Sequence, residues 1–252
     1  MKDSRVPFFR LVATAVAIVL ILFAVMGVLG ASHLASFPLV LTGKVVADLF
    51  RYLPPTLELI VVSFFVASTV GFVSALPSAR SIKPLVTSIA LGLQCIPLFW
   101  LAIAMELVLG GFLRLPMGGF EGADRINLAG HLSRLILPAA VLTMFQFPLV
   151  VEYFNDHPAL GMTTRAEAAS IVGGLAAQLV NNLPDIITAT MITEIVFTWP
   201  GEGRLLWDSL LRQHAAVPLA SFLVFMALFV LVTRFLVEAF AQHRKQAADS
   251  HV

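Results

Sequence analysis

Apolar residues fill most of this 252-residue chain in long runs separated by polar segments. The run at 11–30 contains no charged residue, and its length matches the roughly 20 residues that a helix needs to cross about 30 Å of hydrocarbon. Further runs lie at 56–76, 84–110, 135–151, 183–197 and 218–240. The period-two alternation of membrane β-barrels is absent. Because a helix satisfies its own backbone in lipid, the pattern predicts an all-α, polytopic membrane bundle of about six transmembrane helices.

Composition supports the membrane assignment and excludes several other classes. Hydrophobic residues make up 59% of the chain and charged residues 12%, against about 25% charged in soluble domains. The net charge of +1 gives no reason to expect a nucleic-acid partner. The single cysteine, Cys95, excludes a disulfide framework and makes a thiolate metal site improbable.

Motifs that would carry chemistry in the chain itself are missing. There is no Gly-rich phosphate loop followed by Lys-Ser/Thr, no His-Glu-x-x-His, and no Gly-x-Ser-x-Gly. We therefore expect no catalytic residue, no metal site and no bound cofactor in this chain.

Basic residues suggest how the chain is oriented. Arg80 and Lys83 in a short turn, and the basic residues of both tails, fall on the same side of the bundle. This places both termini in the cytoplasm. We expect an anchor helix and external connector at 1–45, a core domain at 46–245 and a cytoplasmic tail at 246–252, with the first run retained as an anchor rather than cleaved.

Acidic residues inside apolar runs are expensive in a membrane and raise a functional hypothesis. The set consists of Glu58, Glu106, Asp185 and Glu194. Each has two interpretations, a structural role or a place along a transport pathway. For Glu194, pairing with Arg204 or Arg212 is one structural possibility.

The segment at 162–184 is the most informative connection. Thr164 stands three residues before Glu167, which is the spacing of a capping box, and small alanines follow. Gly173 and Gly174 predict the end of that helix. The segment therefore predicts a short cytoplasmic helix with a smooth face, a glycine turn and a second helix entering the membrane. An ordinary Ala-rich connector is the alternative.

This segment also carries a family resemblance. Glu167-Ala168-Ala169, followed after three residues by Gly173, resembles the "EAA" loop of ABC importer permeases. Four other stretches resemble the dipeptide/oligopeptide/nickel branch of that family, in the family's order: residues 53–59 (LPPTLEL), 96–101 (IPLFWL), 135–139 (LILPA) and 194–206 (EIVFTWPGEGRLL). The connection from Gly173 to Pro184 is shorter than in that branch and lacks its basic residues.

The resemblance implies a MetI-like permease fold in the bacterial cytoplasmic (inner) membrane and a role in transport of a small solute, most often a short peptide. It implies four kinds of partner: a second related permease subunit forming a heterodimer, two cytoplasmic ABC ATPase subunits that hold ATP and Mg, an external substrate-binding protein, and the lipid bilayer. The implied ATPase-coupling residues are Thr164, Arg165, Glu167, Ala168, Ala169 and Gly173. The implied pathway or entrance residues are Glu58, Trp100, Glu194, Trp199, Pro200, Gly201 and Arg204.

Two other classes remain open at this point. An ATP-independent secondary carrier or channel would need buried charge pairs along a path and no soluble partner. An intramembrane enzyme would need a catalytic constellation, which the motifs do not supply.

Overall fold

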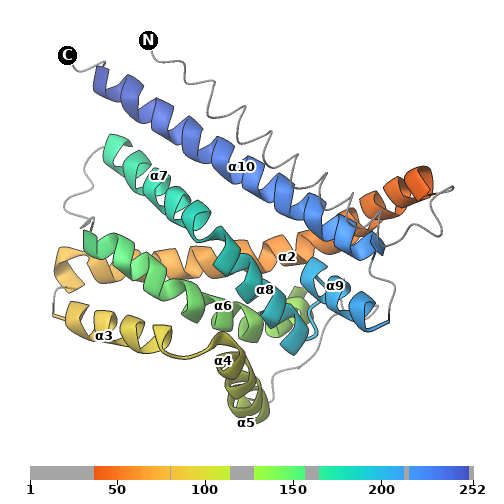
Figure 1. Ribbon diagram of the computed structural model, residues 1–252. Coiled ribbons are helices and arrows are strands. Elements are labelled where there is room, and N and C mark those ends of the chain that lie inside the picture. The colour runs from red at the N-terminus through yellow and green to blue at the C-terminus, as the bar shows by residue number, and fades with distance from the viewer. Residues whose placement is uncertain (1–36, 80, 114–127, 157–164, 213–215, 250–252) are drawn as a thin grey trace.

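A computed structural model of the protein describes residues 37–79, 81–113, 128–156, 165–212 and 216–249. In these residues the fold is entirely helical, which confirms the predicted all-α bundle (Figure 1). The main helices are α2 (Phe37–Ala75), α3 (Lys83–Gln94), α4 (Leu98–Met105), α6 (Leu128–Asp156), α7 (Arg165–Asn181), α8 (Leu183–Val196), α9 (Glu202–Leu211) and α10 (Ala216–Asp249). Short turns at Pro77–Ala79 (η2), Glu106–Gly110 (η3) and Gly111–Leu113 (α5) complete the described elements.

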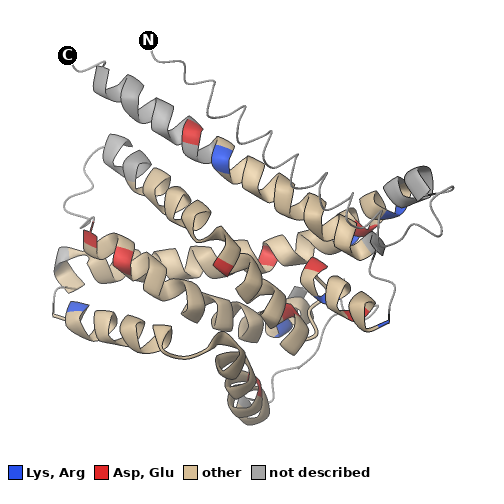
Figure 2. Ribbon diagram, in the orientation of Figure 1, with Lys and Arg blue, Asp and Glu red and all other residues tan. Residues whose placement is uncertain are grey.

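Three helices are long and apolar enough to cross a membrane, with spans at Gly43–Ala75, Ala129–Asp156 and Pro218–Phe235. Helices α3 and α4 with η3 reach the length and hydropathy of a span only together, and they are bent by 104° at the break between them, as in a broken span or a re-entrant loop. The predicted first span, 11–30, lies outside the described residues. Figure 2 shows that charged residues interrupt the middles of these helices only rarely.

Proline explains the bend between α3 and α4 but does not break α2. Pro97 lacks the N–H that would continue α3, so the chain turns there and α4 begins at Leu98. The adjacent Pro54 and Pro55 do not stop α2, which passes through both. The predicted run at 56–76 is therefore only the second half of a helix that begins at Phe37.

The expected helix end at Gly173-Gly174 is wrong. Helix α7 continues through both glycines to Asn181, and the chain breaks at Asn182, just ahead of Pro184 in the first turn of α8. Glycine inside a helix costs about 1 kcal/mol relative to alanine, but here it makes room for a neighbour. A Cβ on Gly174 would lie 2.0 Å from the Tyr153 hydroxyl oxygen and 2.6 Å from its ring.

The fifth predicted span is therefore built from two helices in series. Helix α8 has 14 residues, which at about 1.5 Å each is too short to cross the hydrocarbon alone. The apolar stretch Ile171–Asn181 in α7 precedes it. Together α7 and α8 run the length of the bundle beside α6 and α10 (Figure 1).

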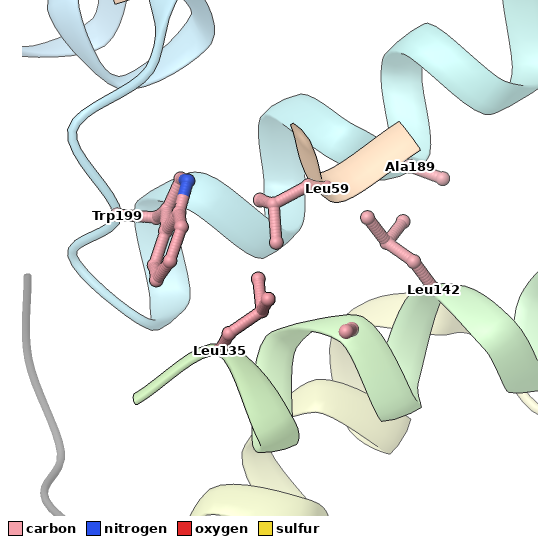
Figure 3. Close-up of a cluster of buried hydrophobic side chains, with 6 residues drawn as sticks. Leu59, Leu135, Leu142, Ala189 and Trp199 are labelled. Carbon is pink, nitrogen blue, oxygen red and sulfur yellow. The ribbon is translucent and has the colours of Figure 1, made fainter. Parts of the chain in front are cut away.

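Apolar side chains from several helices form the core. Figure 3 shows one cluster, in which Leu59 of α2, Leu135 and Leu142 of α6, and Ala189 of α8 meet near Trp199. A second cluster joins Ile60, Ile186 and Phe225 from α2, α8 and α10. The third, at the other end of α2, contains Ala67, Val150 and Phe154, with Ile171 and Leu175 of α7 packed against it.

The packing of Tyr153 on α7 gives the first prediction. Gly174→Ala should destabilise the protein by about 1–3 kcal/mol, because the new methyl group overlaps a ring held between two helices. The measurement is thermal unfolding in detergent. Gly92→Ala is the matched control, since a Cβ there meets nothing within 4 Å and alanine favours the helix; equal destabilisation of both variants would contradict the packing.

Candidate functional site

The carboxyl group of Glu194 is buried where α2, α8 and α9 meet. Its Oε1 accepts a hydrogen bond of 2.6 Å from the Thr56 hydroxyl. Its Oε2 accepts from the backbone N–H groups of Gly203 (2.8 Å) and Arg204 (3.1 Å). A buried carboxyl is tolerated only when such donors surround it. Glu194 thus fastens the end of α8 to the start of α9 and to α2.

The turn between α8 and α9 brings these groups together. Helix α8 ends in a Schellman arrangement, with Trp199 N–H donating to the Glu194 carbonyl (2.9 Å) and Thr198 N–H to the Ile195 carbonyl (3.4 Å). Thr198 occupies the left-handed position, with φ of 50°, which is uncommon for a residue other than glycine. The buried Trp199 indole donates to the Pro55 carbonyl (3.0 Å).

Two glycines allow the turn to approach Glu194. A Cβ on Gly201 would lie 2.0 Å from Glu194 Oε1 and 2.5 Å from Thr56 Oγ1. On Gly203 it would meet Met191 Cγ at 2.7 Å and Glu194 Oε2 at 2.9 Å. The sequence Trp-Pro-Gly-Glu-Gly therefore has a steric reason for both glycines, independent of any ligand.

A second buried acid, Glu202, adjoins the first and was missed in the sequence analysis. Its N–H donates to Thr56 Oγ1 (2.9 Å), and its carboxylate oxygens both lie 3.0 Å from the Ser221 hydroxyl of α10. We call Glu194, Glu202, Thr56, Ser221 and the backbone of 203–204 the Glu194 network. The signal that could have revealed Glu202 is its position at the first turn of a helix directly after a glycine.

The remaining predicted pathway residues divide between this region and others. Glu58 and His131 form a pair (2.5 Å), and the His131 ring lies 5.9 Å from that of Trp199. Pro200 is half-buried within the same turn. Trp100, by contrast, lies on α4, is 65% exposed and contacts Phe99; it is not part of the Glu194 network.

The expected pairing of Glu194 with an arginine side chain is wrong. Arg204 contributes its backbone N–H, while its guanidinium bonds the Thr198 carbonyl and lies 3.5 Å from Asp208. Backbone donors at the start of α9 are already fixed in place, so they satisfy the carboxyl without immobilising a long side chain.

A separate cavity of about 160 Å³ lies beside the break between α3 and α4. Its walls are mostly apolar and come from α3, α4, α6 and α8, including Leu98, Phe145 and Pro148. Two polar side chains line it, Gln94 at the end of α3 and Asp185 in the first turn of α8. Asp185 is exposed and forms no ion pair with a residue that the structure describes.

The predicted coupling residues lie at one end of the bundle. Thr164 is outside the described residues, and α7 begins at the next residue, Arg165. Glu167, Ala168 and Ala169 occupy the first turns of α7, and Gly173 lies in its middle. The opposite end of the α7–α8 pair approaches α9 (Figure 1). Within the described segments, no group of His, Cys, Asp and Glu is placed to hold a metal ion.

The Glu194 network predicts a contrast between two substitutions. Glu194→Ala should cost about 3 kcal/mol or more, because it strands buried donors from α2 and α9. Glu194→Gln should cost far less, since its carbonyl still accepts from residues 203–204 and its amide can donate to Thr56, whose hydroxyl can turn to the Tyr52 carbonyl (3.3 Å). Thermal unfolding in detergent measures both losses. Equal losses would show that the Glu194 carboxyl does not stabilise the protein by accepting these hydrogen bonds.

Glu202 predicts a dependence of stability on pH. It lies outside the apolar spans, and burial raises its pKa from 4.5 to about 7, opposed by the Ser221 hydrogen bond and reinforced by the charge of Asp48. A raised pKa means that the folded state binds the proton more tightly. Its stabilising contribution is therefore complete below about pH 4.5 and is lost as pH rises through about 7, by about 3 kcal/mol at most.

The Glu202→Gln variant tests this dependence, because glutamine remains neutral throughout. Its thermal midpoint should fall less than that of the wild type between pH 4.5 and 7.5. Parallel curves for the two proteins would exclude Glu202 as the titrating group.

Comparison with known proteins gives a match to one family model and several similar permeases. Residues 170–246 match the family of binding-protein-dependent transport system inner membrane components. The putrescine export system permease protein SapB of Escherichia coli K12 is 26% identical over 240 residues, covering 76% of this chain and 74% of that protein. A peptide transport system permease protein SapB from Escherichia coli O157:H7 gives the same values.

A putative peptide transport system permease protein of Brucella abortus is also 26% identical, over 230 residues, covering 81% of this chain and 70% of that protein. The matched family region starts within α7 and includes α8, the Glu194 turn, α9 and most of α10. The chain is thus similar to inner-membrane components of binding-protein-dependent transport systems over residues 170–246, and to named transport permeases over most of its length.

Proposed function

We propose that this chain is one of two permease subunits of an ATP-driven importer of short peptides, and that α7 transmits force from a cytoplasmic ATPase. The observation that carries the proposal is the position of the Glu167-Ala168-Ala169 segment. It forms the first turns of α7, at the end of the bundle where α2 and α6 also finish. Because α7 continues into α8 across one break, movement at this end reaches the cavity beside Asp185.

The names of the relatives support a peptide as the solute. Two of those reported above are peptide transport permeases, and one is a putrescine export permease. Peptides with a free amino terminus and putrescine share a protonated amine. The direction of transport differs between these names, and import is the direction that the resemblance of residues 167–173 favours.

The proposed assembly has further partners. A second permease completes a dimer, two ATPase subunits hold ATP and Mg, and an external binding protein delivers solute. Both termini then face the cytoplasm, with α9 and the Glu194 network toward the outside. Lys83 is the first residue of α3, and this end of α3 lies on the side of the bundle where α7 begins (Figure 2). Basic residues favour the cytoplasmic side, which supports this orientation.

The test is co-purification of this chain with its ATPase subunit. Glu167→Arg should reduce recovery of the ATPase about tenfold or more, since reversing a charge inside a contact costs well above 1.4 kcal/mol. Asp208→Arg, a matched charge reversal on α9 at the other end, should leave recovery unchanged.

Transport by the purified chain alone in liposomes, without an ATPase, would favour the ATP-independent carrier and overturn the proposal. If the wild type and Glu167→Arg recover equal amounts of the ATPase, the complex forms without the proposed contact. In that case α7 is not the element that binds the ATPase.

A further inference from the structure

The cavity between α3, α4, α6 and α8 is placed where a transport pathway needs a binding site. Two helix breaks border it, since α3 ends at Gln94 and α8 starts after the break at Asn182, and the continuous helix α6 contributes Pro148. Interrupted helices at the middle of a membrane protein expose backbone groups that can coordinate a solute. At about 160 Å³, the cavity has the volume of about five waters, at about 30 Å³ each, so it fits one functional group rather than a whole peptide.

Asp185 sits within the apolar part of the fold. The apolar stretch Ile171–Asn181 precedes it, and the buried apolar residues of α8 follow. A carboxylate at such a depth is expensive if it faces hydrocarbon. It is exposed in the single chain and lines the cavity, so a cation in the cavity can reach it.

The other polar groups at the cavity favour a cation with several N–H donors. The Gln94 side chain can present its carbonyl oxygen. The C-terminal end of α3 carries the partial negative charge of a helix terminus.

We propose that this cavity binds the protonated amino group of the transported solute, with Asp185 as its counter-ion. An ammonium group has three donors, and the Asp185 carboxylate and the Gln94 amide oxygen can accept from it. Leu98 and Phe145 then surround the adjoining carbon atoms. The inference rests on the proposed transport function and adds the chemical class of the group that is recognised.

The first experiment measures the charge of the cavity without requiring transport. Ile96, which lines the cavity, is replaced by cysteine in a Cys95→Ser background, in the full chain assembled with its partners. The probes are 2-aminoethyl methanethiosulfonate, a cation, and 2-sulfonatoethyl methanethiosulfonate, an anion. Relative to a free thiol, the cation should react about tenfold faster than the anion, because a nearby carboxylate concentrates it.

The acid variants identify the source of that preference. Asp185→Asn should abolish most of it, and Asp185→Glu should retain it. Glu106→Gln, a matched change on η3 away from the cavity lining, should leave it unaltered. Leu101→Cys, across the break, repeats the measurement if Ile96→Cys fails to assemble.

The second experiment links the site to the solute. Alanyl-alanine should slow the cationic labelling, and N-acetyl-alanyl-alanine, which lacks the ammonium group, should not. Asp185→Asn should weaken protection by alanyl-alanine about tenfold or more, as expected for loss of a charged hydrogen bond.

Three results would overturn the inference: labelling by neither probe, a charge preference that survives Asp185→Asn, or equal protection by the two dipeptides. If one of these occurs while the ATPase still co-purifies through Glu167, the proposed function stands and only the amine site falls. If the wild type binds no ATPase, both fall.

Discussion

The structure depends on one buried carboxyl group with a full set of donors. Glu194 receives hydrogen bonds from Thr56 on α2 and from two N–H groups at the start of α9. Leaving it unsatisfied would cost several kcal/mol, a large share of the stability of most domains. The bond to Thr56 fixes α8 against α2, which packs along α6, and Ser221 extends the network to α10 through Glu202. Four helices thereby share one polar anchor at one end of the bundle.

The opposite end is joined by contacts of a different kind. Helix α7 lies against α6 mainly through apolar residues and the Tyr153–Gly174 contact, with a long hydrogen bond of 3.3 Å from Gln178 to the Leu149 carbonyl. Apolar contacts have no preferred direction, so α7 can shift along α6 at lower cost than α9 can leave Glu194. The break at Asn182 lies between the apolar packing of α7 and the hydrogen-bonded end of α8.

Much of the fold followed from hydrophobic runs and prolines, because both act locally. The runs identified α2, α6 and α10, and the run at 84–110 corresponds to the pair of helices bent by 104°. Local rules failed at Gly174, which lies inside α7 rather than at its end. There the missing side chain leaves room for Tyr153 of α6, a contact between residues distant in the sequence. The sequence also could not predict that Glu194 accepts from backbone N–H groups rather than from an arginine side chain. It does not show which N–H groups the turn before α9 points toward the carboxyl. Glu202 escaped notice because its burial arises only when α10 covers α9.

The position of Asp185 and the helix breaks around it explain each other. A continuous helix presents no free backbone polar group, so an acid beside three unbroken helices would face only hydrocarbon. Pro97 stands at the bend between α3 and α4, Pro184 stands in the first turn of α8, and Pro148 lines the cavity itself. The bends leave room for a cavity next to the acid. An apolar wall with a carboxylate and an amide side chain suits a cation that carries carbon.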